Sequence, residues 1–180
     1  MRLADTDIDP VIHTSDRYLA EVYAIFQHDQ DHLNSVGHQT LLIAGVPGGT
    51  WAFSQAGAGV VGPAITSWTG SRLSAAPPHI GPGSPDGRCL VAARATPNQD
   101  GTWHYEYAVY NHDMDRAARS FRLPLRPGAT VTNLGFSAVQ SDDGSAFTND
   151  AWTGVAAAGA VEWSTGTAAS GPANPLRWGT

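Results

Sequence analysis

The segment "RCLVAARATPNQDGTWHYEYAVYN", residues 88–111, carries the clearest fold signal in this chain. Two strand-like runs flank "TPNQDG", whose Gly101 suits the positive φ that closes a tight turn. Side chains alternate between the two faces of a strand, so Trp103, Tyr105 and Tyr107 share one face. We therefore expect a β-hairpin whose aromatic face lies in the core and whose other face meets solvent.

The other face of the second strand carries His104 and Glu106. These are same-face neighbours about 7 Å apart, two strand rises along the chain. A His/Glu pair can act as general base and acid, with a metal or substrate bridging the two side chains. The same alternation is also typical of an ordinary amphipathic strand with a polar outer face, which we favour.

The rest of the chain continues the β pattern. Its 20 Gly and 12 Pro interrupt the sequence too often for long helices. Short strand patterns recur at roughly ten-residue spacing, which is typical of a sandwich or barrel. A chain of 180 residues is long enough for one domain with a sizeable core. We predict an all-β, antiparallel, jelly-roll-like β-sandwich: a single domain with long Pro/Gly loops.

Within this organisation, residues 1–17 form an irregular lead-in, residues 18–180 form the sandwich, and the Pro/Gly loop 74–87 is a seam. The segment "RYLAEVYAIFQ" (17–27) fits a helix and a buried strand equally well by periodicity. Further strands are predicted at "TLLIAGV" (40–46), "TWAFSQA" (50–56), "AITSWTG" (64–70) and "ATVTNLGFSAV" (129–139), and at the later runs "SFRLPL", "AWTGVAAAG" and "AVEWSTG".

Composition argues against several classes of protein. Only 14% of residues are charged, the net charge is -6 and no Lys/Arg-rich tract occurs, so nucleic acid is not an expected partner. No apolar run is long enough to suggest a membrane span. Cys89 is the only cysteine, which rules out an internal disulfide and leaves the compartment open. The start "MRLADTDIDP" has no signal-peptide pattern, which is compatible with a cytosolic protein or a mature piece of a secreted one.

The segment "HDQDHLNSVGH" (28–38) is the strongest metal-binding candidate. Asp29, Asp31 and Asn34 offer hard oxygen ligands that suit Ca²⁺, although the spacing is not that of an EF-hand. His28, His32 and His38 could instead hold Zn²⁺ with a carboxylate, although "HDQDH" is not the HExxH motif. We favour a solvated polar loop over either metal site, and of the two metals we favour Ca²⁺.

Aromatic residues outside the hairpin are candidates for stacking against sugars. With the hairpin aromatics assigned to the core, the better surface candidates are Trp51, Trp68, Trp152 and Trp178. The sequence contains no nucleophile-elbow, Walker or dinucleotide-binding motif.

The runs "DGTWHYEYAVYN", "SFRLPL", "TVTNLGF" and "NPLRWGT" together resemble a C-terminal β-module of secreted proteins from environmental bacteria. The matching residues are Asp100, Gly101, Trp103, Tyr105, Glu106, Tyr107, Asn111, Asp115, Arg116, Ser120, Phe121, Pro124, Asn133, Gly135, Phe136, Asn174, Arg177, Trp178 and Gly179. A weaker similarity runs through Arg17, Tyr18, Glu21, Asp29, Leu33 and Asn34 and favours a strand for 17–27. The resemblance implies a β fold and an extracellular origin, and it implies no particular reaction.

The chain departs from that group in two places. His28 stands where the group has Asp, and the loop after Asp31 is shorter. The group also continues past "RWGT" with another strand, whereas this chain stops at Thr180. We therefore expect a truncated module, cytoplasmic when expressed as given, whose unpaired C-terminal edge favours a homodimer.

Two functions follow from these patterns. The first is a non-catalytic extracellular β-sandwich module that binds a glycan or another small molecule, or that is purely structural. The alternative is a small metal-dependent hydrolase of esters, lactones or glycosides. In that alternative the 28–38 segment would hold the metal, and His28, His104 and Glu106 would provide acid–base chemistry.

Overall fold

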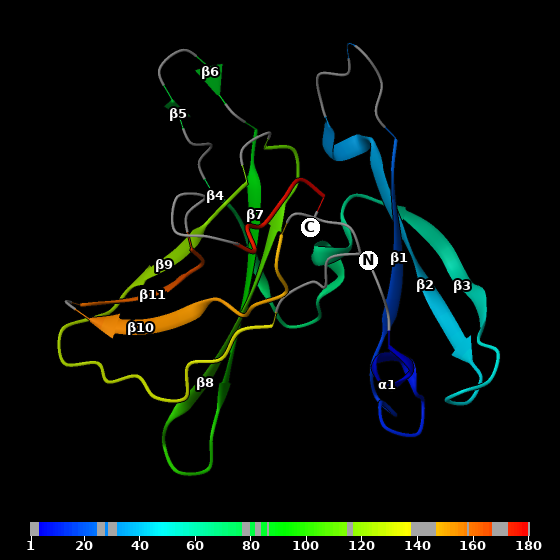
Figure 1. Cartoon of the computed structure of the whole chain (residues 1–180), viewed down its shortest axis with the longest axis horizontal. Coiled ribbons are helices and arrows are strands. Elements are labelled where there is room, and N and C mark those ends of the chain that lie inside the picture. Colours follow the sequence, from blue (N-terminus) through cyan, green and yellow to red (C-terminus); the bar gives the residue numbers. More distant parts are fainter. Residues whose placement is uncertain are drawn as a thin grey trace. The chain divides into compact units, whose positions relative to one another are not determined.

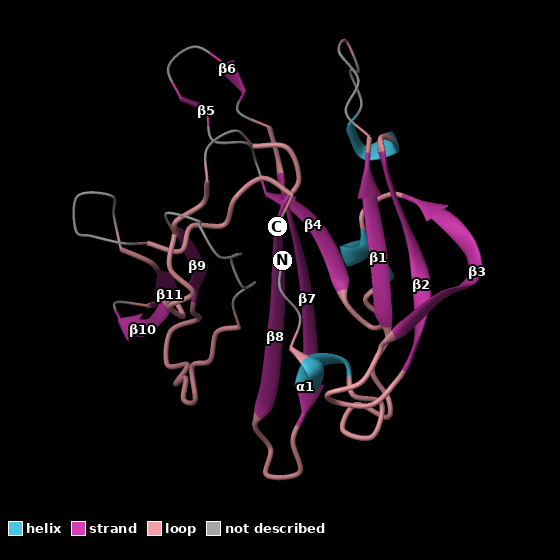
Figure 2. Cartoon of the chain, turned by 45° about the vertical axis from the view of Figure 1, so that its right-hand side comes forward, coloured by secondary structure: helices cyan, strands magenta, loops and turns pink. Residues whose placement is uncertain are grey.

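The computed structural model describes residues 4–24, 28, 32–76, 80–81, 84–85, 87–114, 117–137, 147–157, 159–166 and 173–179. Figures 1 and 2 show that strands dominate this part of the chain, as the sequence predicts. The described helices are the one-turn α1 (Asp5–Ile8) and the 3-10 turns η1 (His32–Asn34) and η2 (Ala64–Ser67). None of the described helices is long and apolar enough to cross a membrane.

Contacts between residues divide the chain into two compact units. Unit 1 comprises Met1–Arg2, Pro78–Arg88 and Asn111–Thr180, and unit 2 comprises Leu3–Pro77 and Cys89–Tyr110. The chain leaves unit 2 within the predicted 74–87 seam. The arrangement of the two units as a sandwich stays a prediction, and each unit is described by itself below.

Unit 2 holds two three-stranded sheets, with strand orders β1-β2-β3 and β4-β7-β8. The first sheet is formed by β1 (Tyr18–Tyr23), β2 (Val36–Ala44) and β3 (Ala52–Val61), and the second by β4 (Arg72–Ala76), β7 (Cys89–Pro97) and β8 (Trp103–Asn111). The strand alternative for 17–27 is thus confirmed by β1, which pairs antiparallel with β2. The apolar core of this unit includes Ile8, Val36, Cys89, Leu90 and Ala92.

The β7–β8 hairpin predicted from "TPNQDG" is confirmed. The Asn98 amide donates to the Thr102 carbonyl at 2.9 Å, and Gly101 has a φ of 84° that other residues adopt only at a cost. The Asp100 carboxylate accepts both the hydroxyl and the amide of Thr102, at 2.6 and 2.9 Å. These two bonds favour the charged carboxylate and lower the pKa of Asp100.

Three segments of unit 2 differ from the sequence prediction. The lead-in contains α1, where the Ala4 amide donates to the Asp7 carboxylate at 2.8 Å. The beginning of the predicted 74–87 loop belongs to β4, which pairs with β7. The predicted strand "AITSWTG" is wrong, because residues 64–67 form η2. There the amide and hydroxyl of Thr66 both donate to the Pro63 carbonyl, a local alternative to strand pairing.

Unit 1 contains a three-stranded antiparallel sheet of order β10-β11-β9 and the short pair β5-β6. Its strands are β9 (Ser120–Pro124), β10 (Thr153–Ala157), β11 (Ala160–Ser164), β5 (Ile80–Gly81) and β6 (Ser84–Pro85). Gly154 lies opposite Trp163, and a Cβ there would come within 2.8 Å of the indole nitrogen. A glycine is therefore required at that position of β10.

The C-terminal segment of unit 1 is bonded to its own chain. Leu176 and Ala118 exchange backbone hydrogen bonds of 2.8 and 3.0 Å, and the Gly179 amide donates to the Asn111 carbonyl at 2.8 Å. The Asn111 side-chain amide also donates to the Leu176 carbonyl at 3.2 Å. Part of the edge that the sequence suggested for dimerisation is thus already paired, and the homodimer stays a prediction.

The strand predicted at 129–139 is wrong as far as residue 137, the last residue of that run that the structure describes. Asn133 adopts a left-handed φ of 57°, which interrupts an extended backbone. The Gly135 carbonyl instead accepts the indole N–H of Trp163 at 2.9 Å. The segment around Gly135 is thus bonded by the Trp163 side chain of β11 and does not pair as a strand of its own.

Candidate functional site

Polar side chains of unit 2 gather around η2, where His38 is buried and its neighbours in the group are half-buried. The 3-10 turn η2 contacts β1, β2 and β7, so it touches strands of both sheets. Four side chains around it form what we call the polar cluster: Glu21 of β1, His38 of β2, Ser67 of η2 and Tyr110 of β8. Glu21 and His38 are directly paired across β1 and β2, and therefore lie on the same face of that sheet.

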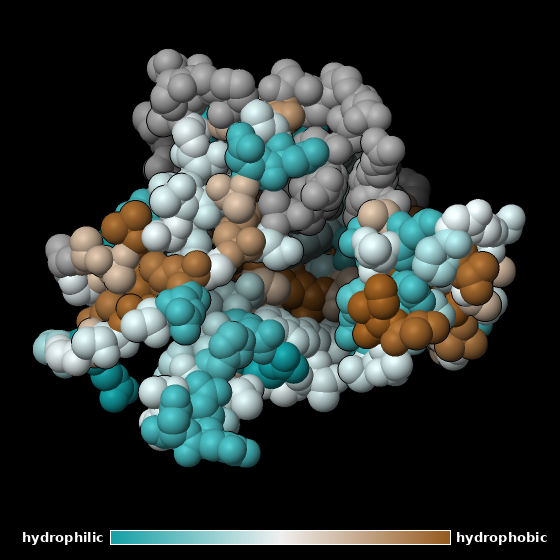
Figure 3. All heavy atoms as spheres, turned by 60° about the horizontal axis from the view of Figure 1, so that its bottom comes forward, coloured by the Kyte–Doolittle hydropathy of each residue, from teal (hydrophilic) through white to brown (hydrophobic). Residues whose placement is uncertain are grey.

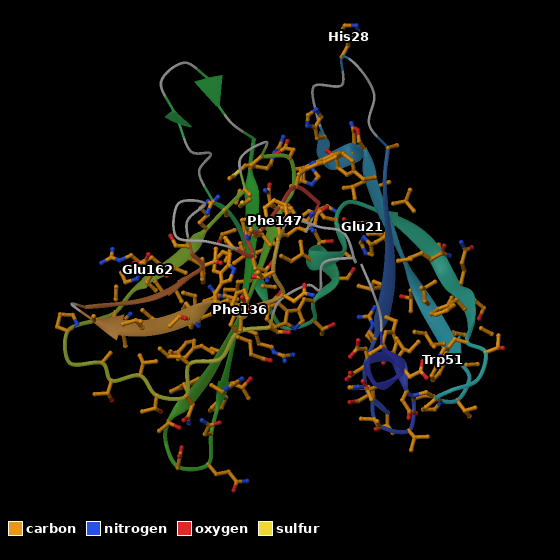
Figure 4. All side chains as sticks on the ribbon, viewed as in Figure 1. Glu21, His28, Trp51, Phe136, Phe147 and Glu162 are labelled. Carbon is orange, nitrogen blue, oxygen red and sulfur yellow. The ribbon has the colours of Figure 1, made fainter. Side chains whose placement is uncertain are left out.

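Glu21, which is labelled in Figure 4, accepts two hydrogen bonds that connect β1 to β8 and to η2. Its Oε1 accepts the Tyr110 hydroxyl at 2.5 Å, and its Oε2 accepts the Ala64 amide at 2.5 Å. One carboxylate thus bonds both to β8 and to the first residue of η2. Hydrogen bonds to a charged acceptor contribute about 1.5–3 kcal/mol each, so Glu21 fixes the position of η2.

His38 is buried, with 4% of its surface exposed, and both ring nitrogens are hydrogen-bonded. Nδ1 lies 2.7 Å from the Gly62 carbonyl oxygen and Nε2 lies 2.5 Å from the Ser67 Oγ. A carbonyl oxygen can only accept, so Nδ1 carries the proton. In the neutral ring Nε2 is then the acceptor, and the Ser67 hydroxyl donates to it.

A second group of polar side chains connects β7 and β8 to the end of η2. Arg94 donates to Glu106 Oε2 through Nε at 2.8 Å and Nη2 at 2.6 Å, and its guanidinium lies 5.2 Å from the centre of the Trp68 ring. His104 Nε2 is 4.0 Å from Glu106 Oε1, too far for a hydrogen bond. The predicted same-face pairing of His104 and Glu106 is confirmed, and Arg94 is the stronger partner of Glu106.

The aromatic face of β8 is exposed, and its prediction as a core face is wrong. Trp103, Tyr105 and Tyr107, which we call the aromatic strip, are 55%, 57% and 36% exposed. The polar face of β8 is the inner one, because Glu106 and Tyr110 find partners there in Arg94 and Glu21. Partial burial and the neighbouring Tyr105 raise the pKa of Tyr107, so its hydroxyl remains protonated at neutral pH.

Of the four tryptophans predicted to stack against sugars, Trp178 is 46% exposed and the other three are placed differently. Trp152, expected at the surface, is 7% exposed and stacks on Phe136 at 5.1 Å between ring centres. Its indole N–H donates to the Asn174 carbonyl at 2.6 Å, so it is a core residue of unit 1. Trp68 is half-buried and has the Arg94 guanidinium over its ring, as described above. Trp51 is also half-buried, and its indole N–H donates to Asp5 at 2.9 Å (Figure 4).

The Trp51 indole is expected to report the ionisation of Asp5. The Gly48 amide and the Trp51 indole donate to this carboxylate at 2.6 and 2.9 Å, which lowers the pKa of Asp5. Their contribution to stability is complete above the unfolded-state pKa and is lost as pH falls through the lower folded-state pKa. In an NMR pH titration, the Trp51 indole N–H should shift with a midpoint below the usual aspartate range. Asp5→Asn should abolish that transition, and a midpoint at the usual value would contradict the two bonds.

The predicted metal ligands are not brought together within the described residues. Asp29 and Asp31 lie outside those residues, so the Ca²⁺ and Zn²⁺ predictions stay predictions. His28 is exposed in a left-handed turn with a φ of 81° (Figure 4), and His32 and Asn34 lie on η1. His38, predicted in the same loop, lies on β2 with both ring nitrogens bonded elsewhere. Among the described residues, no three His, Cys, Asp or Glu side chains gather as metal ligands.

The residues predicted to provide acid–base chemistry, His28, His104 and Glu106, are not all brought together either. The described partners of Glu106 are Arg94 and His104, and His28 is not one of them. The residues that do converge, Glu21, His38, Ser67 and Tyr110, are separated by up to 89 positions in the sequence. No motif marks them, and only the pairing of β1 with β2 and the turn η2 bring them together.

No protein-family model, curated protein or solved structure matches this chain. Function is therefore inferred from the two features that the geometry isolates, the aromatic strip and the polar cluster.

Proposed function

We propose that this protein is an extracellular binding module of β structure that holds a glycan chain along the aromatic strip. The observation that supports the proposal is the exposure of Trp103, Tyr105 and Tyr107 in a row on one face of β8. Large aromatic rings are normally buried, and a row of three exposed rings indicates a surface that receives a ligand.

The chemistry of the strip favours a neutral ligand with both apolar and polar faces. Alternation on β8 places Trp103, Tyr105, Tyr107 and Val109 on this face, and none of them is charged. Tyrosine and tryptophan combine an apolar ring with one polar group. A pyranose ring fits this combination, because its C–H face can lie on an aromatic ring while its hydroxyls bond to phenol, indole or water.

The geometry of a strand also favours a linear ligand. Side chains two positions apart stand about 7 Å apart on a strand, so the three ring positions span about 13 to 14 Å. β8 is at the edge of the sheet of order β4-β7-β8, where no further described strand pairs beside it. An unbranched polysaccharide can therefore lie along the row and place successive sugars over successive rings.

Apolar side chains elsewhere are also exposed, and Figure 3 shows several of them at the surface of the face drawn. The exposed apolar residues of unit 2 include Val22, Leu42, Phe53, Val60 and Val61. These are aliphatic residues and one phenylalanine, which lack the polar group of tyrosine or tryptophan. The strip differs from them in chemistry. Trp178 of unit 1 is also 46% exposed, whereas the strip presents three rings with polar groups in one row, and this row selects it as the glycan site.

The wild-type protein is expected to bind linear polysaccharides in pull-down and glycan-array experiments. Insoluble cellulose, xylan and mannan should each be incubated with the protein, and the bound fraction measured by gel electrophoresis. Retention on at least one linear polysaccharide, reversed by the free oligosaccharide, is the expected result. Absence of binding to every glycan in both experiments would contradict the proposal.

A further inference from the structure

We propose that Ser67 and His38 form a nucleophile–base pair that hydrolyses small carboxylic esters. This activity is separate from glycan binding, because the pair belongs to the polar cluster and the aromatic strip lies on the outer face of β8. The pair is defined by the 2.5 Å contact between Ser67 Oγ and His38 Nε2 and by the 2.7 Å contact between Nδ1 and the Gly62 carbonyl.

The neighbouring hydroxyls show that this arrangement is not the usual one for a serine in a turn. Thr66 Oγ1 donates to the Pro63 carbonyl and Ser71 Oγ donates to the Trp68 carbonyl, both at 2.7 Å and both three residues back. Such local bonds to the backbone are the common use of serine and threonine hydroxyls. Ser67 instead bonds to a buried imidazole 29 positions away in the sequence.

The histidine is held in the orientation that a general base requires. The Nδ1–H group donates a hydrogen bond to the Gly62 carbonyl, which fixes the tautomer whose lone pair on Nε2 faces Ser67. A third group that orients the base is a recurrent element of serine nucleophile sites. Here a main-chain carbonyl takes the place that a carboxylate often occupies. The Ala64–Glu21 bond holds the first residue of the turn that ends in Ser67.

Ser67, the proposed nucleophile, is more exposed than His38, the proposed base. Ser67 is half-buried and so retains access to solvent, whereas His38 is 4% exposed. A small substrate that approaches from the solvent side of Ser67 would meet the hydroxyl, and the water that hydrolyses the acyl-serine would approach Nε2 from the same side. Partial burial of Ser67 favours a small acyl group, so acetyl esters are the substrate class that we assign.

The reaction balances without a metal or a cofactor. Ser67 Oγ attacks the acyl carbon, and its proton passes to His38 Nε2. The tetrahedral intermediate then expels the alcohol, which takes that proton from Nε2, and an acyl-serine remains. Water attacks the acyl-serine and gives its proton to Nε2, and the carboxylic acid leaves as Oγ recovers the proton.

The test uses the full chain with 4-nitrophenyl acetate and a fluorophosphonate. We expect 4-nitrophenolate release with an acylated Ser67 detectable by mass spectrometry, and one phosphonyl group on Ser67 after fluorophosphonate treatment. Ser67→Ala should abolish both, and His38→Gln should lower the acylation rate at least about 100-fold. Ser71→Ala is the matched control, since it removes a hydroxyl from the turn that follows η2 and should leave both signals unchanged.

A second pair of variants keeps the test decisive if His38→Gln fails to fold. The thiol of Ser67→Cys beside His38 should react with iodoacetamide at least about 10-fold faster than the thiol of Ser71→Cys, because a paired imidazole stabilises the thiolate. An unmodified Ser67 in the wild type, an unchanged rate in Ser67→Ala, or equal reactivity of the two thiols would each overturn the proposal. Failure of glycan binding would leave these outcomes unaffected.

Discussion

A chain with Trp152→Ala is expected to lose about 3–5 kcal/mol of unfolding free energy, the usual cost of removing a buried aromatic side chain. Trp152 is 7% exposed, lies 5.1 Å from the Phe136 ring with 8° between the ring planes, and donates to the Asn174 carbonyl. The substitution removes the stacked partner of Phe136, leaves a cavity and deprives a carbonyl of its donor. Since whole domains are stable by only about 5–15 kcal/mol, unit 1 should be largely destabilised.

Urea unfolding followed by far-UV circular dichroism measures this loss. Trp103→Ala is the control, because it makes the same chemical change at a side chain that is 55% exposed, and its midpoint should be nearly unchanged. Trp152→Phe keeps an aromatic ring and loses the N–H donor. Its loss of unfolding free energy should therefore lie between those of Trp103→Ala and Trp152→Ala. Equal midpoints for Trp152→Ala and Trp103→Ala would show that Trp152 is not a core residue.

The second large effect is expected in ligand binding. Replacing both Trp103 and Tyr105 by alanine should weaken binding of a linear oligosaccharide about 5- to 150-fold. This range assumes that each ring contributes about 0.5–1.5 kcal/mol by stacking. Because both rings are more than half exposed, the free energy of unfolding should change little. Isothermal titration calorimetry of the double variant and the wild type gives the comparison.

His104→Ala is the matched control for that experiment. Its side chain is 61% exposed but stands on the opposite face of β8 from the strip. We expect wild-type affinity in this variant. If His104→Ala weakens binding as much as the double variant does, the ligand lies on the other face of the strand and the strip is not the site.

The hairpin illustrates what the sequence could predict. The turn residues and the period of two determined that β7 and β8 pair and which side chains share a face. They did not determine which face turns inward, because that depends on partners far along the chain. Glu21 lies 89 positions from Tyr110, and its hydrogen bond is one reason why the polar face of β8 is the inner one.

The polar cluster was not predictable for a related reason. His38 was assigned to a polar loop and Ser67 to a strand, and neither stands in a recognised motif. Their contact depends on the antiparallel pairing of β1 with β2 and on η2, whose local hydrogen bonds to Pro63 outweigh the strand preference of "AITSWTG". Patterns of hydrophobicity and turn residues describe single elements, whereas this contact depends on how three elements meet.

NMR of the tryptophan indole groups can show whether a glycan binds along the aromatic strip. A linear oligosaccharide that the wild type retains should be titrated to saturation while the indole N–H signals are followed. Binding along the strip should shift the Trp103 signal with ligand concentration and leave the signal of the buried Trp152 in place. An unshifted Trp103 signal at saturation, with shifts confined to other tryptophans, would contradict it.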